Sequence, residues 1–202
     1  MTFSGNNANR GAAIFVDDSR MTVFNADFGN NVAFDDYNLP VGKGGAIYVG
    51  HNSKGFLNNS TFHNNEALYG ACVCVEGNSL FNVSDVKFTN NSATVTNDPF
   101  HQTGLGGVMY VSGNSKVVMN NTYSSNNKAR HGGAVYANDR CMCFVDNSSI
   151  SFNKAASGPE TYIDNSSFLK IDNCMREGNG SIDGNNLNLS NGSKCYLDGK
   201  YF

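Results

Sequence analysis

The stretch Phe62–Lys87, FHNNEALYGACVCVEGNSLFNVSDVK, is one 26-residue unit, and the next unit begins at Phe88. The same pattern extends outward to both ends of the chain. Of the seven steps between unit starts, four are 26 residues and one is 25; the other two become 26 when inserts of 8 and 10 residues are removed. A fixed period of this length indicates stacked structural repeats. The unit starts, or anchors, are Phe3, Phe28, Phe62, Phe88, Ser124, Ile150, Arg176 and Phe202.

An asparagine follows every anchor but the last by three residues. Asparagine tolerates the left-handed conformation of tight turns, and identical side chains stacked in register can bond to one another along the stack. A structural ladder is therefore expected at one corner of each repeat. Its members are Asn6, Asn31, Asn65, Asn91, Asn127, Asn153 and Asn179.

Between the corners, apolar and polar residues alternate in short runs such as Ile47-Tyr48-Val49. Period-two alternation bounded by Gly, Asn and Ser predicts strands joined by turns. Each repeat has room for three strands and three corners. The predicted fold is all-β: a right-handed parallel β-helix of about seven three-strand coils, with ~26 residues per coil. We expect one domain over residues 1–202, uncapped at both ends, with loop inserts at 34–43 and 94–105.

Composition narrows the range of partners. The net charge is −3 and charged residues make up 15% of the chain, so no basic surface for nucleic acid is expected. No apolar run approaches the ~18 residues of a transmembrane segment. The chain starts and stops near anchors, and open coil ends are unpaired strand edges. Two expectations follow: a segment of a longer solenoid, or a filament subunit that stacks end to end.

Two motifs recur in fixed phase, FxxN and GGA(I/L/V). The first is present as Phe28–Asn31 and Phe62–Asn65, and the second as Gly44–Ile47 and Gly132–Val135. This pairing resembles the repeat signature of the chlamydial polymorphic membrane proteins, over roughly residues 1–165. The resemblance implies a secreted β-helical, autotransporter-passenger-like adhesin. Because both motifs are architectural, the resemblance assigns no binding residue.

Catalytic chemistry is not expected. Polysaccharide lyases and hydrolases need clustered carboxylates. The Asp17-Asp18 and Asp35-Asp36 pairs lie at corners or in an insert, without acids stacked on them in neighbouring repeats. The four histidines fall in four different phases of the repeat. We therefore predict no catalytic residue and no cofactor, and keep a carbohydrate-active β-helix built on the acidic insert as the alternative function.

The six cysteines do not suggest a metal site. Cys72/Cys74 and Cys141/Cys143 lie on different faces nearly three repeats apart, whereas zinc needs about four converging ligands. Cys143 and Cys195 share a column two coils apart, too far for a disulfide. Bridges within the two Cys-x-Cys pairs are the only strain-free exceptions. We expect buried, reduced thiols and no bound metal.

Asn-x-Ser/Thr occurs ten times, about twice as often as the Asn content alone would give. Asn59, Asn147 and Asn179 belong to corner ladders and should be poor glycan acceptors. The candidate N-glycosylation sites, expected to face solvent, are Asn58, Asn82, Asn90, Asn120, Asn165 and Asn188. A eukaryotic source would make the chain a glycoprotein; in a bacterium the motifs would carry no meaning.

Two features are candidate binding surfaces. The first is an aromatic column that alternation places on the outer face of one sheet, where tyrosine could stack on sugars or on a neighbouring fibre. Its members are Phe15, Tyr48, Tyr110, Tyr136 and Tyr162, with Cys74 interrupting the column, and the four tyrosines are the candidate binding residues. The second is the pair of inserts, which leave the same corner two coils apart and should nearly touch. They contribute Asp35, Asp36, Tyr37, Phe100 and His101.

Together these patterns predict a non-enzymatic, extracellular structural or adhesive β-helix, secreted or held at the cell surface. Its expected partners are further copies of itself, through end-to-end or lateral stacking, or surface glycans and host proteins. Assembly into a surface filament and glycosylation are two further properties that these patterns allow.

Overall fold

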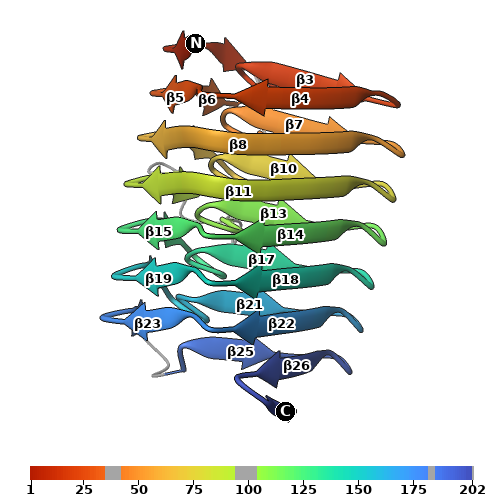
Figure 1. Ribbon diagram of the computed structural model, residues 1–202, viewed down its shortest axis with the longest axis vertical. Coiled ribbons are helices and arrows are strands. Elements are labelled where there is room, and N and C mark those ends of the chain that lie inside the picture. Colours follow the sequence, from red (N-terminus) through yellow and green to blue (C-terminus); the bar gives the residue numbers. More distant parts are fainter. Residues whose placement is uncertain (35–41, 94–103, 182–184, 202) are drawn as a thin grey trace.

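The computed structural model describes residues 1–34, 42–93, 104–181 and 185–201. Over these ranges the protein is all-β: its strands lie in three sheets, and it forms no helix that could cross a membrane. Every strand pairing but one is parallel. In Figure 1 the labelled strands are stacked one above another from the N-terminus to the C-terminus.

The large sheet has 13 strands and forms the front of the stack in Figure 1. Its strands are β1 (Thr2–Ser4), β4 (Arg20–Phe24), β5 (Asp27–Gly29), β8 (Lys54–His63), β11 (Leu80–Thr89), β14 (Lys116–Asn120), β15 (Tyr123–Ser125), β18 (Met142–Asp146), β19 (Ser149–Ser151), β22 (Phe168–Asp172), β23 (Met175–Glu177), β26 (Lys194–Leu197) and β27 (Lys200–Tyr201).

The second and third sheets have seven strands each. The second sheet contains β3 (Ile14–Asp17), β7 (Ile47–Gly50), β10 (Val73–Val75), β13 (Met109–Val111), β17 (Val135–Ala137), β21 (Thr161–Ile163) and β25 (Leu187–Leu189). The third contains β2 (Asn7–Ala8), β6 (Val32–Ala33), β9 (Glu66–Ala67), β12 (Ser92–Ala93), β16 (Lys128–Ala129), β20 (Lys154–Ala155) and β24 (Gly180–Ser181).

The strand register follows the predicted period. Phe28 pairs with Phe62 and Phe62 with Phe88, and the later anchors continue the same column. The three phenylalanine side chains are fully buried. The rings of Phe28 and Phe62 stack at a centroid distance of 4.4 Å, and those of Phe62 and Phe88 contact each other at 5.1 Å with a tilt of 33°. Side chains of the large and second sheets meet in one apolar core.

The asparagines at the anchor corner form a continuous hydrogen-bonded ladder. Each Nδ2 donates to the Oδ1 of the next asparagine, at distances from 2.8 Å (Asn6 to Asn31) to 3.4 Å (Asn153 to Asn179). The backbone N–H of each donor reaches the same oxygen. Because the ladder is buried in its centre, it supplies the partners that water cannot supply there.

The two glycines of the GGA motif are required for different physical reasons. Gly44 has a φ of +66°, a left-handed conformation that glycine adopts without a Cβ penalty. At Gly45 a Cβ would lie 2.1 Å from the carbonyl oxygen of Ala71 and 2.6 Å from that of Glu66. The second glycine therefore permits the close approach of backbones in neighbouring repeats.

The C-terminal edge differs from the uncapped end that the period predicts. Lys200 and Tyr201 turn back and pair antiparallel with Leu197 and Tyr196, so β27 lies along the edge of β26. The cause is the two-residue turn Asp198-Gly199, whose φ values are +43° and +89°. An Asp-Gly pair favours this type of hairpin turn.

Candidate binding face of the large sheet

The insert residues form the second candidate binding surface that the sequence predicts. Asp35, Asp36, Tyr37, Phe100 and His101 all lie outside the described residues.

The tyrosine column is present but is not the exposed surface that alternation predicts. Its rings stack at centroid distances of 5.7 Å (Tyr110–Tyr136) and 5.2 Å (Tyr136–Tyr162), yet Tyr48 is fully buried and Tyr136 nearly so. Tyr110 and Tyr162 are half-buried. The expectation of exposure is wrong for Tyr48 and Tyr136. A side chain of the preceding corner lies against each of the rings of Tyr48, Tyr110 and Tyr162. These side chains are those of Arg10, Tyr69 and His131.

A polar network occupies part of the same sheet. The Tyr48 hydroxyl donates to Glu76 Oε1 at 2.7 Å, and Lys43 Nζ lies 2.8 Å from Glu76 Oε2. Burial by itself raises the pKa of Glu76, but the hydrogen bonds from Lys43 and Tyr48 outweigh it and leave the pKa lowered. Burial and the Glu76 carboxylate raise the pKa of Tyr48. The groups satisfy one another, so this network is structural.

The candidate glycosylation sites divide into two groups. Asn90, Asn120 and Asn165 are exposed, as predicted from their phase. The other three, Asn58, Asn82 and Asn188, are half-buried. Two of these side chains are hydrogen-bonded to a neighbouring repeat, which holds them against the sheet. Asn58 Nδ2 donates to Ser84 Oγ and Asp85 Oδ2, and Asn188 Nδ2 donates to Ser157 Oγ.

All six cysteines are free thiols, and only Cys174 is more than slightly exposed. Burial raises the pKa of Cys141 to about 12 and that of Cys195 to about 11, so both are protonated thiols at neutral pH. Among the described residues, no group of three or more His, Cys, Asp or Glu side chains is placed to hold a metal ion.

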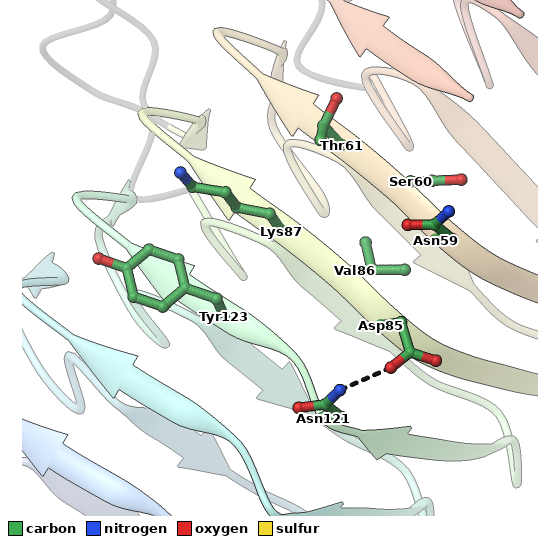
Figure 2. Close-up of a pocket in the computed structure, with 8 residues that line it drawn as sticks. All are labelled: Asn59, Ser60, Thr61, Asp85, Val86, Lys87, Asn121 and Tyr123. Carbon is green, nitrogen blue, oxygen red and sulfur yellow. Dashed lines mark hydrogen bonds between the residues drawn. The ribbon is translucent and has the colours of Figure 1, made fainter. Parts of the chain in front are cut away.

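The outer face of the large sheet carries a shallow hollow of about 340 Å³, shown in Figure 2. It crosses three successive repeats, and we call it hollow A. That volume lies within the range of small-ligand sites. Its lining residues are Asn59, Ser60, Thr61, Asp85, Val86, Lys87, Asn121 and Tyr123.

Asp85 departs from the repeat at the bend that divides the long strands. The stacked residues at this bend all have positive φ, and the others are asparagines: Asn25, Asn59, Asn121, Asn147 and Asn173. Asp85 accepts hydrogen bonds on both sides, from Asn121 Nδ2 at 2.6 Å and from Asn58 Nδ2 at 2.9 Å. The dashed line in Figure 2 marks the first of these bonds. Hydrogen bonds to a carboxylate are the stronger kind, and they fix its position.

Lysine–aromatic pairs recur on this face. Lys87 Nζ lies 5.4 Å from the ring centroid of Tyr123, which is its partner in the adjacent strand. Lys116 lies 4.9 Å from the ring of Phe144, and Lys170 lies 5.3 Å from that of Tyr196. Each contact is a cation–π geometry that holds the lysine stem and the ring against each other. The aromatic surface is therefore ordered although it faces solvent.

A second hollow, hollow B, of about 270 Å³, continues along the same face. It is next to hollow A, because the Asn121 N–H donates to the carbonyl oxygen of Asp146. Within it Asp146 and Asp172 are partners in adjacent strands. The Lys170 ammonium lies 2.7 Å from Asp172 Oδ2. Its lining residues are Lys116, Val118, Phe144, Val145, Asp146, Lys170 and Asp172.

The charges in each hollow balance. Hollow A holds one carboxylate, Asp85, and one ammonium, Lys87. Hollow B holds two of each. Amide, hydroxyl and aromatic groups make up most of the remaining lining of hollow A. The remaining lining of hollow B is apolar: Val118, Phe144 and Val145. Such a face can exchange hydrogen bonds and ring contacts with a ligand without attracting either sign of charge over a long range.

Comparison with known proteins gives no relative: no family model, no curated protein and no solved structure matches the chain. The sequence and the geometry above are therefore the basis for a functional assignment.

Proposed function

We propose that the chain is a right-handed parallel β-helix of about seven three-strand coils that acts as a non-enzymatic, extracellular adhesive and structural protein. Three parallel sheets with a common register support the fold. The resemblance of the FxxN and GGA repeats to chlamydial polymorphic membrane proteins supports a secreted or cell-surface location. Surface glycans and host proteins are the partners that this class of protein engages.

One observation carries the adhesive role: two adjacent, open, charge-balanced hollows lie on one face of the large sheet. Elsewhere the recurring polar groups are bonded to one another within the stack, as in the asparagine ladder. A rigid sheet that presents ordered lysine and aromatic side chains to solvent suits contact with a second surface.

Adhesion through this face is tested with beads coated with the purified protein. Charge reversal of Lys87 and Lys116 (K87E/K116E) should reduce bead attachment to epithelial cells at least fivefold, since both ammonium groups lie on the proposed contact face. The matched control reverses two exposed lysines of the third sheet, Lys128 and Lys154 (K128E/K154E), and should leave attachment unchanged. Equal losses in both variants, or wild-type beads that do not attach, would contradict the assignment.

Filament assembly is a separate part of the proposal. End-to-end stacking through the large sheet needs a free strand edge at each joint. Since β27 covers the edge of β26, a joint at this position requires β27 to detach. Lateral stacking has no such requirement.

A second candidate, a carbohydrate-active β-helix, is favoured by the stacked carboxylates in hollow B. Adjacent strands lie ~4.8 Å apart, close to the separation of about 5 Å between the two carboxyl groups of retaining glycosidases. We expect no turnover, because both side chains sit on an open surface and Asn173 and Lys170 bond the carboxylates.

Reducing-end and unsaturated-product assays on neutral and acidic polysaccharides measure that turnover. Activity that disappears in Asp172→Asn and persists in Asp139→Asn, an acid at another corner, would replace the adhesive assignment with the enzymatic one.

A further inference from the structure

We propose that hollow A is a binding site for a neutral carbohydrate chain, with Asp85, Lys87 and Tyr123 as its recognition residues. This inference rests on the proposed adhesive function and names the class of its ligand. It has four steps: the exception that Asp85 makes to the repeat, its free acceptor positions, the open side of the Tyr123 ring and the balance of charge.

Asp85 is the exception in the column of asparagines at this bend. At the same bend, five other repeats hold the left-handed conformation with asparagine. Three of these asparagines, Asn59, Asn147 and Asn173, donate to a side chain of the preceding repeat. A carboxylate therefore adds a negative charge that the architecture does not need. A residue that breaks the pattern of its repeat is a candidate for a functional role.

The Asp85 carboxylate has acceptor capacity left. A carboxylate has about four acceptor positions, two on each oxygen. Asn121 occupies one position on Oδ1 and Asn58 one on Oδ2. One position on each oxygen is left for a donor from solvent or ligand, and two neighbouring hydroxyl groups of a sugar ring match this arrangement. Asp85 itself is exposed.

Tyr123 supplies a ring surface. It is 40% exposed, and Lys87 packs over its ring from the preceding repeat. Its partner in the following strand is Ser149, a small residue. The ring thus has a bulky neighbour along the stack on one side only, and the apolar face of a sugar can pack against the other. Figure 2 shows Tyr123 and Lys87 along the same edge of the hollow, away from Asp85.

The charge balance selects a neutral ligand. A polyanion would gain from Lys87 but lose against Asp85, and a polycation would meet the reverse. Hollow B extends the same face without a net charge. From β8 to β22 the two hollows span five stacked strands, four spacings of ~4.8 Å or about 19 Å. This length favours an extended chain that runs along the stack over a single sugar.

Binding is tested with defined probes: neutral β-glucan, mannan and galactan hexasaccharides, and acidic hexasaccharides of polygalacturonate and heparin. We expect at least one neutral probe to bind, with an affinity that changes less than twofold between 50 and 500 mM NaCl, because no net charge is screened. Asp85→Asn and Tyr123→Ser should each weaken it at least tenfold. Both variants should fold, since asparagine stands at five equivalent bends and serine at the next position of the Tyr123 column.

The matched controls change the same chemistry elsewhere. Asp139→Asn removes an acid that also has a positive φ, at another corner, and Phe152→Ser removes an exposed aromatic outside the hollow. Both should leave the affinity within twofold of wild type. Circular dichroism and urea unfolding identify any variant that loses its fold, and Tyr123→Phe then replaces Tyr123→Ser as the milder probe, with a smaller loss expected.

Three results would overturn the inference: no neutral probe binds, only an acidic probe binds with a steep salt dependence, or Asp85→Asn binds like wild type. Bead adhesion separates this failure from that of the proposed function. Beads that attach through Lys87 and Lys116 without any glycan binding point to a protein partner and keep the adhesive role. Glycan binding without bead attachment keeps the site and removes the adhesive role.

Discussion

Replacement of Asn91 by alanine is expected to lower the free energy of unfolding by about 4 kcal/mol, because it leaves two or three buried polar groups unpaired at about 1–3 kcal/mol each. Asn91 is fully buried in the middle of the ladder. Its Oδ1 accepts from both the backbone N–H and Nδ2 of Asn65, at 2.9 and 3.0 Å. Its Nδ2 donates to the carbonyl oxygen of Phe62 and to Asn127 Oδ1.

The same change at the end of the ladder provides the control. Asn6 is half-buried, and its Nδ2 donates to Asn31 Oδ1 at 2.8 Å. Asn6→Ala should therefore cost about 1 kcal/mol, the value of one partly exposed hydrogen bond. Urea unfolding followed by circular dichroism measures both variants. Similar losses for Asn91→Ala and Asn6→Ala would show that burial does not set the strength of the ladder.

The repeat architecture was predictable because equivalent residues of stacked repeats occupy the same environment, so the same residue type recurs at each position. One period located the anchors, the asparagine corner and the glycines, and the structure pairs the anchors in that order. The hairpin at Asp198-Gly199 was missed, although Asp-Gly is a strong hairpin signal. Here a local turn preference prevails over the continuation of the parallel stack.

The binding face was harder to predict, for physical reasons. Alternation tells which side chains point outward but not what covers them, so it predicts an exposed tyrosine column. Its cover comes from corner residues such as Tyr69, whose side chain direction the period does not determine. Asp85 could have been found from sequence: it is the one acid in a column of asparagines, and a search for exceptions within each column would have located it.

Replacement of Phe62 by alanine is the second large effect, with an expected loss of about 3–5 kcal/mol for a fully buried phenylalanine. Phe62 lies between Phe28 and Phe88 in the ring stack, at 4.4 and 5.1 Å. The strands of three successive repeats are paired at this point, so the wall of the cavity cannot collapse without breaking the register. Phe62→Leu keeps most of the volume and should cost about 1 kcal/mol.

Phe3→Ala is the matched control for position in the stack. Phe3 contacts only one ring of the column, that of Phe28 at 4.8 Å, and is half-buried. Partial burial gives about half the transfer free energy of a buried side chain, or roughly 1–2 kcal/mol. Urea unfolding of the three variants orders them as Phe62→Ala, Phe3→Ala and Phe62→Leu, with the last two close together. If Phe3→Ala lowered the free energy of unfolding as much as Phe62→Ala, the rings would act as independent local contacts. The prediction that they form one continuous core would then be wrong.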